Sequence, residues 1–555
     1  MTNRTAGCHF ERCLLALSVL VLMGSSVRAA GPEVQSMLPA GVQRGAEATI
    51  RLSGKFDTWP PEVWFDRPGL SAEPAEEKGQ LVLRAPADAP PGTYWMRLYD
   101  SAGATPPWPV VVGMLPEVTE SDDEDSKIAE STRQLPCTIN GRLAKRGEID
   151  IYRVALSKGE TLIASVVANG VLGSPMDGVL QIADPRGFVL KQVDDECGLD
   201  PLIVFRAPQD GEYLVRLFAF PETPDSSIAY AGDQTYVYRL TLTTGGFVDH
   251  ALPLAVRAGS TTESKLCGWN LGDEPRTASL VAAPDCEQVA AFCEASAGVI
   301  PVAVVQHTCV TADAAADPAE PQSLELPVTV SGRLAKPAES HTFRFKGEKG
   351  QKLRIAVESR SLSFPLDAAI QIVDVDGKVL QEVDDASRAP DPRTEFEVPS
   401  DGQYDVTIRD LYGRGGLRFA YRMTIEPVRP DFSLSLAADQ FTLTGEKPLE
   451  IPVAIDRSGF SGEIEITAIG LPEGVTAEPV TSPGEGDTAK EVKLKLTAAT
   501  GAAGGPFRVA GRAADASEPI ERTARFSVPN KPGTLADAWL TVAATEDAEA
   551  AVSDE

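Results

Sequence analysis

The amino-acid sequence predicts an all-β protein made of tandem antiparallel β-sandwiches, and three observations lead to this prediction. Apolar and polar residues alternate with a period of two through most of the chain, as in Tyr213-Leu-Val-Arg-Leu217. Turn-forming residues separate these short runs, since the chain has 47 Gly and 43 Pro. Long segments also repeat, as tandem domains do. Helical periodicity is scarce, and residues 286–297 are the best candidate for a helix.

The first 29 residues are predicted to be a secretory signal peptide. Arg4 and Arg12 precede an apolar run from Cys13 to Met23, and Val27-Arg28-Ala29 supplies small residues where a signal peptidase cleaves. An uncleaved anchor is the alternative, although the run is short for a membrane helix, which needs about 20 apolar residues. No later segment is long and apolar enough to span a bilayer. We therefore expect a secreted, periplasmic or cell-surface protein that is not inserted in the membrane after cleavage.

The charge of the chain narrows the class of partner. Its formal net charge is −29 at pH 7, and nucleic-acid binding requires clustered Lys and Arg that neutralise phosphates. A nucleic-acid partner is therefore not expected. An acidic surface favours solubility, divalent cations and basic partners. We expect a protein or polysaccharide of the cell envelope as the partner.

Two repeats divide the chain. Leu135-Pro-Cys-Thr-Ile-Asn-Gly-Arg-Leu-Ala-Lys145 recurs as Leu326-Pro-Val-Thr-Val-Ser-Gly-Arg-Leu-Ala-Lys336, followed in both cases by Asp-x-x-Gly, Val-Asp-Asp and Asp-Gly-x-Tyr in the same order. Residues 38–54 align in the same way with residues 252–268. The duplicated unit is thus a small domain, an acidic linker and a larger domain. Both linkers should be solvated and mobile.

These repeats and the changes in composition set the expected domain boundaries. The segments are a signal peptide (1–29), a first small domain (32–115), an acidic linker (116–134), a first large domain (135–245), a second, Cys-rich small domain (246–310), a linker (311–325), a second large domain (326–428), a fifth β domain (429–530) and a frayed acidic tail (531–555).

The two large segments, 135–243 and 326–426, resemble the bacterial pre-peptidase C-terminal domain. The motifs that support the resemblance are Gly-Arg-Leu, Gly147-Glu-Ile-Asp-Ile-Tyr-Arg153, Ser-Pro-Met-Asp177, Asp-x-x-Gly, Asp-Asp and Asp-Gly-x-Tyr. The resemblance implies a jelly-roll-like sandwich of a kind that is usually appended to secreted proteases and that in some relatives binds calcium. His341 stands where Asp150 stands in the first copy, which puts an acidic role of that position in doubt for the second.

The remaining domains resemble immunoglobulin-like modules. Residues 34–115 and 249–306 are similar to TIG-type domains, with Pro91-Gly-Thr-Tyr-Trp-Met-Arg-Leu-Tyr99 as the closing strand of the first. Residues 431–529 resemble the immunoglobulin-like modules of exported planctomycete proteins. The whole layout is similar to planctomycete proteins labelled as subtilase-type serine protease precursors.

No catalytic constellation is present in the sequence. None of His250, His307 and His341 is followed by Glu, so there is no His-Glu-x-x-His zinc motif. The Gly-x-Ser-x-Gly nucleophile motif and the phosphate-binding glycine motifs are also missing. We predict no catalytic residues and no organic cofactor.

Paired carboxylates suggest a candidate calcium site. Asp194-Asp195 and Asp384-Asp385 follow a predicted strand at the same place in both large domains, and a hard cation would relieve their mutual repulsion. Asp177 and Asp367 could approach these pairs across a loop. The alternative is that the carboxylates cap turns.

The cysteines suggest disulfides, since an even number remains after the signal and export leads to an oxidising compartment. Cys137 and Cys197 are both lost in the second copy, so we predict that they pair with each other. Three connectivities are open for the other four, and zinc is a minor alternative. Those four are Cys267, Cys286, Cys293 and Cys309.

The first small domain is rich in tryptophan, with Trp59, Trp64, Trp95 and Trp108. Packing in the core or at a sheet edge is one interpretation, and an exposed aromatic platform for polysaccharide or protein is the other. Taken together, the sequence predicts an exported, non-catalytic binding or scaffold protein that gains avidity from several modules. The alternative function is that of an accessory member of a secreted subtilase-type protease system.

Overall fold

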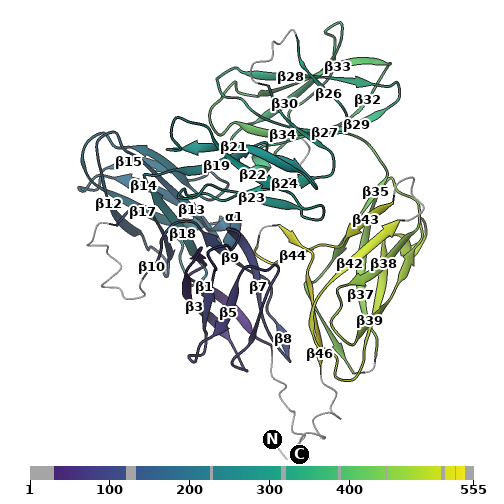
Figure 1. Cartoon of the computed structure of the whole chain (residues 1–555), viewed down its shortest axis with the longest axis horizontal. Coiled ribbons are helices and arrows are strands. Elements are labelled where there is room, and N and C mark those ends of the chain that lie inside the picture. Colours follow the sequence, from purple (N-terminus) through teal and green to yellow (C-terminus); the bar gives the residue numbers. More distant parts are fainter. Residues whose placement is uncertain are drawn as a thin grey trace, which may run out of the picture.

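The structure is a computed structural model that describes residues 31–120, 133–224, 229–313, 320–385, 389–445, 447–513, 519–531 and 533–543. These residues form strands almost throughout, with a few short helical turns. Figure 1 shows the sheets gathered into five packed groups, which confirms the predicted all-β fold of tandem sandwiches. Among these residues, none of the helices has the length and apolar character needed to cross a bilayer. The predicted signal peptide lies outside the described residues.

The first domain is a two-sheet sandwich. One sheet has the strand order β1-β3-β6-β5 and the other β2-β9-β7-β4, with β8 paired to β7. Buried side chains from both sheets, among them Ile50, Leu81 and Tyr94, form its core. The strands are β1 (Glu33–Leu38), β2 (Gly41–Gln43), β3 (Glu47–Lys55), β4 (Glu62–Phe65), β5 (Ser71–Pro74), β6 (Gln80–Arg84), β7 (Gly92–Asp100), β8 (Gly103–Ala104) and β9 (Trp108–Gly113).

The second domain is a larger sandwich of the sheets β10-β11-β18-β13-β16 and β12-β17-β14-β15. In β17 the side chains of Tyr213, Val215 and Leu217 are buried, as the alternating pattern predicts. The elements are β10 (Glu117–Thr119), β11 (Cys137–Arg142), β12 (Asp150–Leu156), β13 (Thr161–Val167), α1 (Asn169–Leu172), β14 (Met176–Ala183), β15 (Val189–Val193), β16 (Leu202–Arg206), β17 (Gly211–Pro221) and β18 (Val237–Thr243).

The fourth domain repeats this topology strand for strand. Its sheets are β25-β27-β34-β29-β32 and β26-β28-β33-β30-β31, in which only β26 lacks a counterpart in the second domain. The elements are β25 (Thr308–Thr311), β26 (Gln322–Leu324), β27 (Val328–Arg333), β28 (Ser340–Gly347), β29 (Lys352–Glu358), η2 (Arg360–Leu362), β30 (Ala368–Asp374), β31 (Val379–Val383), β32 (Arg393–Glu397), β33 (Gly402–Asp410) and β34 (Ala420–Pro427).

The repeated Gly-Arg-Leu motif has a packing reason that is the same in both large domains. The ring of Tyr238 lies against Gly141, where an added Cβ would be only 2.3 Å from the ring. Tyr421 covers Gly332 in the same way, at 2.4 Å. Both tyrosines are fully buried, so only glycine allows the ring to pack onto the neighbouring strand.

The third domain is small, with the sheets β19-β21-β22 and β20-β24-β23. The helix expected at 286–297 is wrong, because this segment contains strand β23, which pairs antiparallel with β24. Val289, Ala291 and Cys293 all join the core, which is the two-residue spacing of a strand. The strands are β19 (Phe247–Leu252), β20 (Ala255–Arg257), β21 (Thr261–Trp269), β22 (Arg276–Val281), β23 (Gln288–Ala291) and β24 (Ile300–Val305).

The fifth domain includes much of the segment expected to be a frayed tail. Strand β46 lies between β36 and β42 in one of its sheets, and Ala538 and Leu540 are fully buried. The prediction of a frayed tail is therefore wrong for 538–543, whereas 544–555 lie outside the described residues. The elements are β35 (Asp431–Leu436), β36 (Gln440–Thr444), β37 (Leu449–Ser458), β38 (Ile464–Ile469), β39 (Val475–Glu478), β40 (Val480–Ser482), η3 (Asp487–Ala489), β41 (Glu491–Ala498), β42 (Gly505–Ala513), β43 (Ile520–Thr523), β44 (Phe526–Ser527), β45 (Thr534–Leu535) and β46 (Ala538–Ala543).

The predicted linkers are partly built into the sheets. In the first of them, β10 pairs parallel with β11, and the Arg239 guanidinium donates to both carboxylate oxygens of Glu117 at 2.6 and 2.8 Å. In the second, β26 pairs with β28. The expectation of solvated linkers is wrong for these ends, because a buried ion pair and ladder hydrogen bonds hold them in the sheets. Residues 121–132 and 314–319 lie outside the described part of the chain.

A buried arginine joins the second, third and fourth domains. Arg418 of the fourth domain, which is 7% exposed, donates to Asp249 Oδ1 of the third at 2.9 Å. It also donates to the carbonyl oxygen of Glu196 in the second domain at 2.6 Å and to that of Ser363 in its own domain at 2.6 Å. One guanidinium therefore holds three domains together.

A second buried arginine joins the first and fifth domains, which lie beside each other in Figure 1 although they are the ends of the described chain. Arg97 is fully buried and donates to Asp439 Oδ2 at 2.7 Å and to the carbonyl oxygen of Thr105 at 2.9 Å. Next to it, the rings of Tyr99 and Trp539 are 4.6 Å apart. The chain thus folds back on itself, unlike modules on a mobile string.

Candidate functional site

The predicted carboxylates of the second domain line one pocket together with aromatic side chains. Asp177 lies on β14 opposite Phe220 of β17, and Asp194-Asp195 directly follow β15. The pocket has a volume of about 300 Å³. We call it the acidic–aromatic pocket, and its lining residues are Asp177, Val179, Gln181, Gln192, Asp194, Asp195, Phe218, Phe220 and Tyr230.

Three aromatic rings in mutual contact, two pairs of them edge to face, form one wall of the acidic–aromatic pocket. The ring centroids of Phe218 and Tyr230 are 4.4 Å apart with a tilt of 30°, and those of Phe220 and Tyr230 are 5.6 Å apart. Tyr230 comes from the loop between β17 and β18, where Ala231 bridges to Ala219 of β17. The negative faces of such rings favour a positively charged group.

The carboxylates of this pocket have no basic side chain beside them in its described lining, although Asp195 also borders a neighbouring pocket that Arg360 and Arg414 of the fourth domain line. None of the described residues that line it is Lys, Arg or His. Burial, followed by the charges of Asp195 and Asp194, raises the pKa of Asp177. Burial and the charge of Asp194 likewise raise the pKa of Asp195. The site therefore concentrates negative charge that a cationic ligand would relieve.

The structure does not support the predicted calcium site. Within the described ranges, no group of three or more His, Cys, Asp or Glu side chains is placed to hold a metal ion. Instead, the Asp195 amide donates to Asp194 Oδ1 at 3.0 Å, and the Asp385 amide donates to Asp384 Oδ1 at 2.9 Å. One oxygen of Asp194 and one of Asp384 thus accept a local backbone hydrogen bond, as the turn-capping alternative expects.

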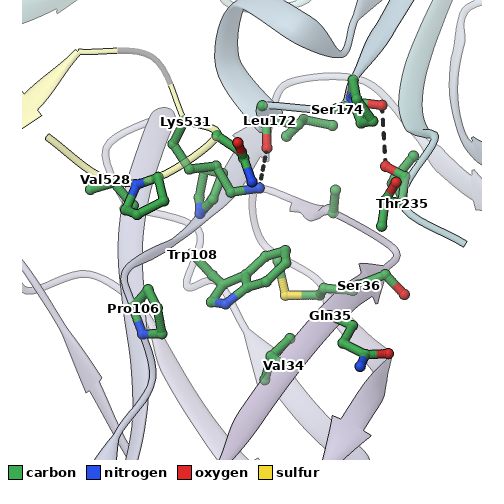
Figure 2. A pocket seen from close by; sticks show the side chains of 18 of the residues that line it. Val34, Gln35, Ser36, Pro106, Trp108, Leu172, Ser174, Thr235, Val528 and Lys531 are labelled. Carbon is green, nitrogen blue, oxygen red and sulfur yellow. Dashed lines mark hydrogen bonds between the residues drawn. The ribbon is translucent and has the colours of Figure 1, made fainter. Parts of the chain in front are cut away.

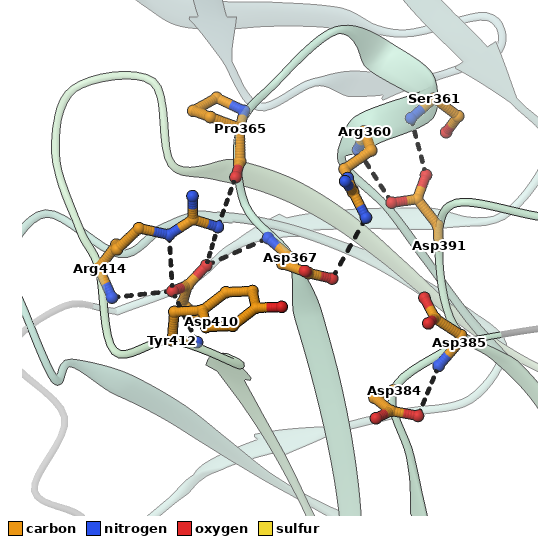
Figure 3. Close-up of polar contacts among 10 residues, drawn as sticks. All are labelled: Arg360, Ser361, Pro365, Asp367, Asp384, Asp385, Asp391, Asp410, Tyr412 and Arg414. Atoms are coloured by element: carbon orange, nitrogen blue, oxygen red, sulfur yellow. Dashed lines mark hydrogen bonds and ion pairs between the residues drawn. The ribbon is translucent and has the colours of Figure 1, made fainter.

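In the fourth domain, one of the corresponding carboxylates, Asp367, has a basic partner from the same domain (Figure 3). Asp367, the counterpart of Asp177, is 3.5 Å from Arg360. Its neighbour across the strand pair, Asp410, accepts from Arg414 at 3.2 Å. Arg409 occupies the register position of Phe218 and pairs with Glu382 at 3.0 Å. An arginine thus accompanies Asp367 in the second copy, whereas its counterpart Asp177 has none in the lining of its pocket.

A pair of equivalent buried aspartates was missed by the sequence analysis. Asp200 accepts from the amides of Ala168, Asn169 and Gly170 at 2.8–3.2 Å, and burial raises its pKa to about 6. Asp391 accepts in the same way from the amides of Arg360 and Ser361, both at 2.9 Å. The two aspartates follow the same 191-residue offset as the repeated Leu-Pro motif, so the alignment could have identified them.

We expect Asp200→Ala to destabilise the second domain markedly. The substitution leaves three amides at the start of α1 without their acceptor, of which that of Ala168 is buried, and an unsatisfied buried donor costs about 1–3 kcal/mol. Thermal unfolding combined with hydrogen exchange at 168–170 measures the effect. Asp194→Ala, which removes an exposed turn-capping side chain, is the control and should change stability by less than about 0.5 kcal/mol. Equal melting of the two variants would contradict the capping role.

The position that carries Asp150 in one copy and His341 in the other serves the same structural purpose in both. The Tyr238 hydroxyl donates to Asp150 Oδ2 at 2.5 Å, and the Tyr421 hydroxyl bonds His341 Nδ1 at 2.7 Å. Both side chains are buried. The position satisfies a buried tyrosine, and this explains why an acid is not required there.

All six cysteines of the described chain are free thiols, so the predicted Cys137–Cys197 disulfide is wrong. Cys137 belongs to the core of the second domain, where it acts as a small apolar residue that Val328 replaces in the other copy. Cys197 packs in a separate cluster with Leu115 and Phe247 at the boundary with the third domain. The other four thiols are Cys267, Cys286, Cys293 and Cys309.

The third domain contains a buried row of Asp249, His250 and Cys267. Asp249 Oδ2 lies 2.8 Å from His250 Nδ1, and His250 faces Cys267 in the register of β19 and β21. Burial would raise the pKa of the Cys267 thiol, but His250, Arg333 and Lys265 together lower it. These three residue types are the ones found in a nucleophilic catalytic triad. However, His250 is 0% and Cys267 4% exposed, so a substrate cannot reach either side chain in this structure.

The tryptophans of the first domain do not share one platform. Trp59 packs on Phe56 and donates to the carbonyl oxygen of Ala75 at 3.0 Å. Trp64 lies against Trp539 of the fifth domain, with ring centroids 6.1 Å apart. Trp59 and Trp64 therefore agree with the interpretation that these tryptophans pack in a core or against a neighbouring domain.

The fold and this site define a multidomain protein of antiparallel β-sandwiches with a candidate ligand pocket on one of two related domains. Residues 339–410 match the family model described as Bacterial pre-peptidase C-terminal domain, so this part of the chain is such a domain. No curated protein sequence matches the chain.

Several solved structures are similar to parts of the chain. The pre-peptidase C-terminal domain of a Bacillus anthracis collagenase is 12% identical, covering 20% of this chain and 99% of that one with a TM-score of 0.17. The Salmonella Typhimurium periplasmic inhibitor of g-type lysozyme, PliG, is 17% identical, covering 22% and 100% with a TM-score of 0.15. ZmpB of Clostridium perfringens, an M60 catalytic domain with two CBM51 domains, is 9% identical, covering 71% and 46% with a TM-score of 0.14.

Proposed function

We propose that the chain is an exported, non-catalytic binding protein of the cell envelope or extracellular space. Its acidic–aromatic pocket would bind a lysine or arginine side chain of a partner protein. The observation that carries the proposal is the contrast between the two large domains. Asp367 of the fourth domain is 3.5 Å from Arg360 of the same domain, whereas its counterpart Asp177 lies with Asp194 and Asp195 in a pocket that no described Lys, Arg or His lines.

The chemistry of the pocket supports a cationic side chain as the ligand. Three carboxylates supply charge-assisted hydrogen bonds, which are roughly twice as strong as neutral ones. The rings of Phe218, Phe220 and Tyr230 add a cation–π surface, which contributes about 0.5–2 kcal/mol. A guanidinium or ammonium group satisfies both features, and a neutral sugar satisfies only the second.

The domain organisation is part of the same proposal. We propose that 135–245 is a second pre-peptidase C-terminal domain, which its strand order, shared with the fourth domain, supports. The domains at 32–115, 246–310 and 429–530 would be immunoglobulin-like modules, the first two of TIG type. Their two-sheet antiparallel topology supports this assignment. The whole would be an exported protein laid out like the planctomycete proteins labelled as subtilase precursors.

Titration of the full chain with a tetra-arginine peptide, followed by calorimetry, tests the proposed ligand. We expect Asp194→Asn/Asp195→Asn to weaken binding at least tenfold, because two of the three carboxylates are lost. Tyr230→Leu should weaken it several-fold, in line with the loss of about 0.5–2 kcal/mol of cation–π attraction.

The matched control is Asp384→Asn/Asp385→Asn, which removes the same charge at the equivalent turn of the fourth domain. A chain with a net charge of −29 attracts any polycation, so this control separates the pocket from the overall field. We expect a change of less than twofold. Equal losses in both double variants would refute the pocket and leave only nonspecific attraction.

Binding of the peptide should also weaken as the pH falls. Burial and neighbouring acids raise the pKa values of Asp177 and Asp195, so protons compete for these carboxylates at a higher pH than for an ordinary aspartate. The wild-type affinity should therefore begin to fall at a higher pH than ordinary aspartates would give, and the fall should be smaller in Asp194→Asn/Asp195→Asn. A pH-independent affinity for the wild-type chain would contradict a role for these groups.

An accessory role in a secreted subtilase-type protease system is the second candidate, and the pre-peptidase C-terminal domain at 339–410 favours it. Such a role would make the partner of the pocket a protease or its substrate. A casein assay on the purified chain tests the non-catalytic part of the proposal, because turnover sensitive to serine-protease inhibitors would show that the chain itself is an enzyme.

A further inference from the structure

A second cavity lies where the first, second and fifth domains meet, away from the acidic–aromatic pocket. Its volume is about 430 Å³, within the range of pockets that hold drug-sized ligands. Strand β1 and residues 106–109 of the first domain form one side, and residues 172–175 of the second form another. Residues 528–531 of the fifth domain close it, as Figure 2 shows.

A half-buried lysine is the main charged group of this cavity. Lys531 Nζ donates to the carbonyl oxygen of Leu172 at 2.6 Å and lies 4.2 Å from the centre of the Trp108 ring. In Figure 2 its side chain runs between these two groups. Burial lowers the pKa of Lys531 to about 8, so most of the population is still protonated at neutral pH.

Lys531 lacks a counter-charge. It forms no ion pair among the residues that the structure describes, and burial alone accounts for its lowered pKa. Glu222 also lines the cavity, but it is exposed and does not shift that pKa. A charge that is partly removed from water gains from a counter-ion, because it has lost part of its hydration. The carbonyl oxygen of Leu172 is the acceptor of Lys531 Nζ among the described residues, so an anion inside the cavity can accept from the other N–H groups.

The rest of the lining is mainly apolar and in part flat. Pro106, Pro107 and Trp108 form one wall, with Val34 and Met37 beside them. The indole face of Trp108 is suited to an aromatic or alicyclic body, and the prolines add rigid apolar surface. An anionic group beside Lys531 and an apolar body against Trp108 would fill the two parts of the cavity.

We propose that this three-domain cavity binds a small organic carboxylate that carries an aromatic or other apolar body, with Lys531 as the residue that recognises the carboxylate. The site is independent of the acidic–aromatic pocket, which selects the opposite charge. Because it is formed by three domains, its ligand would also stabilise their docking.

Calorimetry with 1-naphthylacetate and its neutral amide, 1-naphthylacetamide, tests the proposal on the full chain. We expect the wild-type chain to bind the carboxylate at least tenfold more tightly than the amide at pH 7. Lys531→Met should bind the two compounds equally. Lys493→Met, in which a surface lysine of the same domain is replaced, should keep the wild-type preference. Equal binding of both compounds to the wild-type chain, or no binding of either, would overturn the proposal.

A second measurement needs no variant and remains valid if Lys531→Met fails to fold. A carboxylate beside Lys531 raises the pKa of the ammonium group from about 8, so binding near pH 8 must take up a fraction of a proton. Titrations in buffers of different ionisation enthalpy should show this uptake for 1-naphthylacetate and none for the amide. Carboxylate binding without proton uptake would place the anion elsewhere and refute the role of Lys531.

Discussion

Replacing Arg418 with methionine is expected to destabilise the junction of the second, third and fourth domains by about 3–5 kcal/mol, the cost of breaking a buried ion pair. Arg418 is buried and donates to the carboxylates of Asp249 and Glu196 and to the carbonyl oxygen of Ser363. Methionine fills much of the volume but leaves the buried Asp249 carboxylate without its guanidinium. Calorimetric unfolding of the full chain should show a lower first transition, and small-angle scattering should show a larger radius of gyration.

The control for this variant is Arg409→Met in the same domain. Arg409 is 41% exposed and pairs with an exposed Glu382, so its loss should cost less than about 1 kcal/mol. If Arg418→Met melts like Arg409→Met, the three-domain junction does not depend on this guanidinium.

The destabilisation by Arg418→Met should also depend on pH. Burial lowers the pKa of His250. Its bond to Asp249 and the neighbouring Cys267 together raise the pKa by more than burial lowers it, so the pKa lies above the ordinary value for histidine. Stability from the charged His250 is therefore present at low pH and is lost as the pH rises through that raised pKa. In the variant, the protonated imidazole is the remaining cation beside Asp249. The loss in stability should be smaller at pH 6 than at pH 8, and the same loss at both would contradict this account.

The domains could be predicted from the sequence because their signals are local. The alternation of apolar and polar residues in a strand is visible over a few neighbouring positions. The duplicated Gly-Arg-Leu motif likewise marks the glycine on which a tyrosine packs, Gly141 in one copy and Gly332 in the other. The two related topologies follow from those repeats. The segment at 286–297 shows the limit, since apolar residues spaced by two and by four are compatible with either type of element over a short range.

The arrangement of the domains could not be predicted in the same way. Arg418 and Arg97 each bond to residues far away in the sequence, and nothing near them marks them as different from surface arginines. The predicted linkers and tail were misjudged for the same reason. Acidic and Ala-rich composition indicates a solvated segment, but Glu117 finds Arg239 and β46 finds a place in a sheet only after the chain has folded.

The candidate site was predicted only in part. The repeat alignment correctly pointed to Asp177, Asp194 and Asp195, which do line one pocket. The aromatic wall was missed because Tyr230 lies in the loop between β17 and β18, which is longer than the corresponding loop between β33 and β34 and does not align with it. The arginines of the fourth domain were missed too, although Arg409 stands in the register position of Phe218, since only the strand pairing shows that the two positions are equivalent.

Replacing Arg97 with methionine is expected to release the fifth domain from the first. The fully buried Arg97 donates to Asp439 Oδ2 at 2.7 Å and to the carbonyl oxygens of Thr105 and Asp537 at 2.9 and 3.2 Å. Methionine leaves these acceptors unpaired between the domains, at a cost of about 3–5 kcal/mol. Limited proteolysis between β34 and β35 should become faster, and the fifth domain should melt as a separate transition. Arg84→Met, at an exposed ion pair of the first domain, should change neither measurement.

A double variant separates the two reasons for such a result. The first possible reason is that removal of Arg97 leaves the Asp439 carboxylate buried without a partner. In that case Arg97→Met/Asp439→Leu should restore docking, because well-packed apolar pairs often match or exceed buried ion pairs in stability. If the guanidinium holds the interface through the carbonyl oxygens of Thr105 and Asp537 as well, the double variant should recover only part of the loss. We expect partial recovery, because those two backbone acceptors stay unpaired in both variants. Full recovery would reduce the role of Arg97 to charge balance, and the remaining contact of Trp539 with Tyr99 would then be sufficient to hold the domains together.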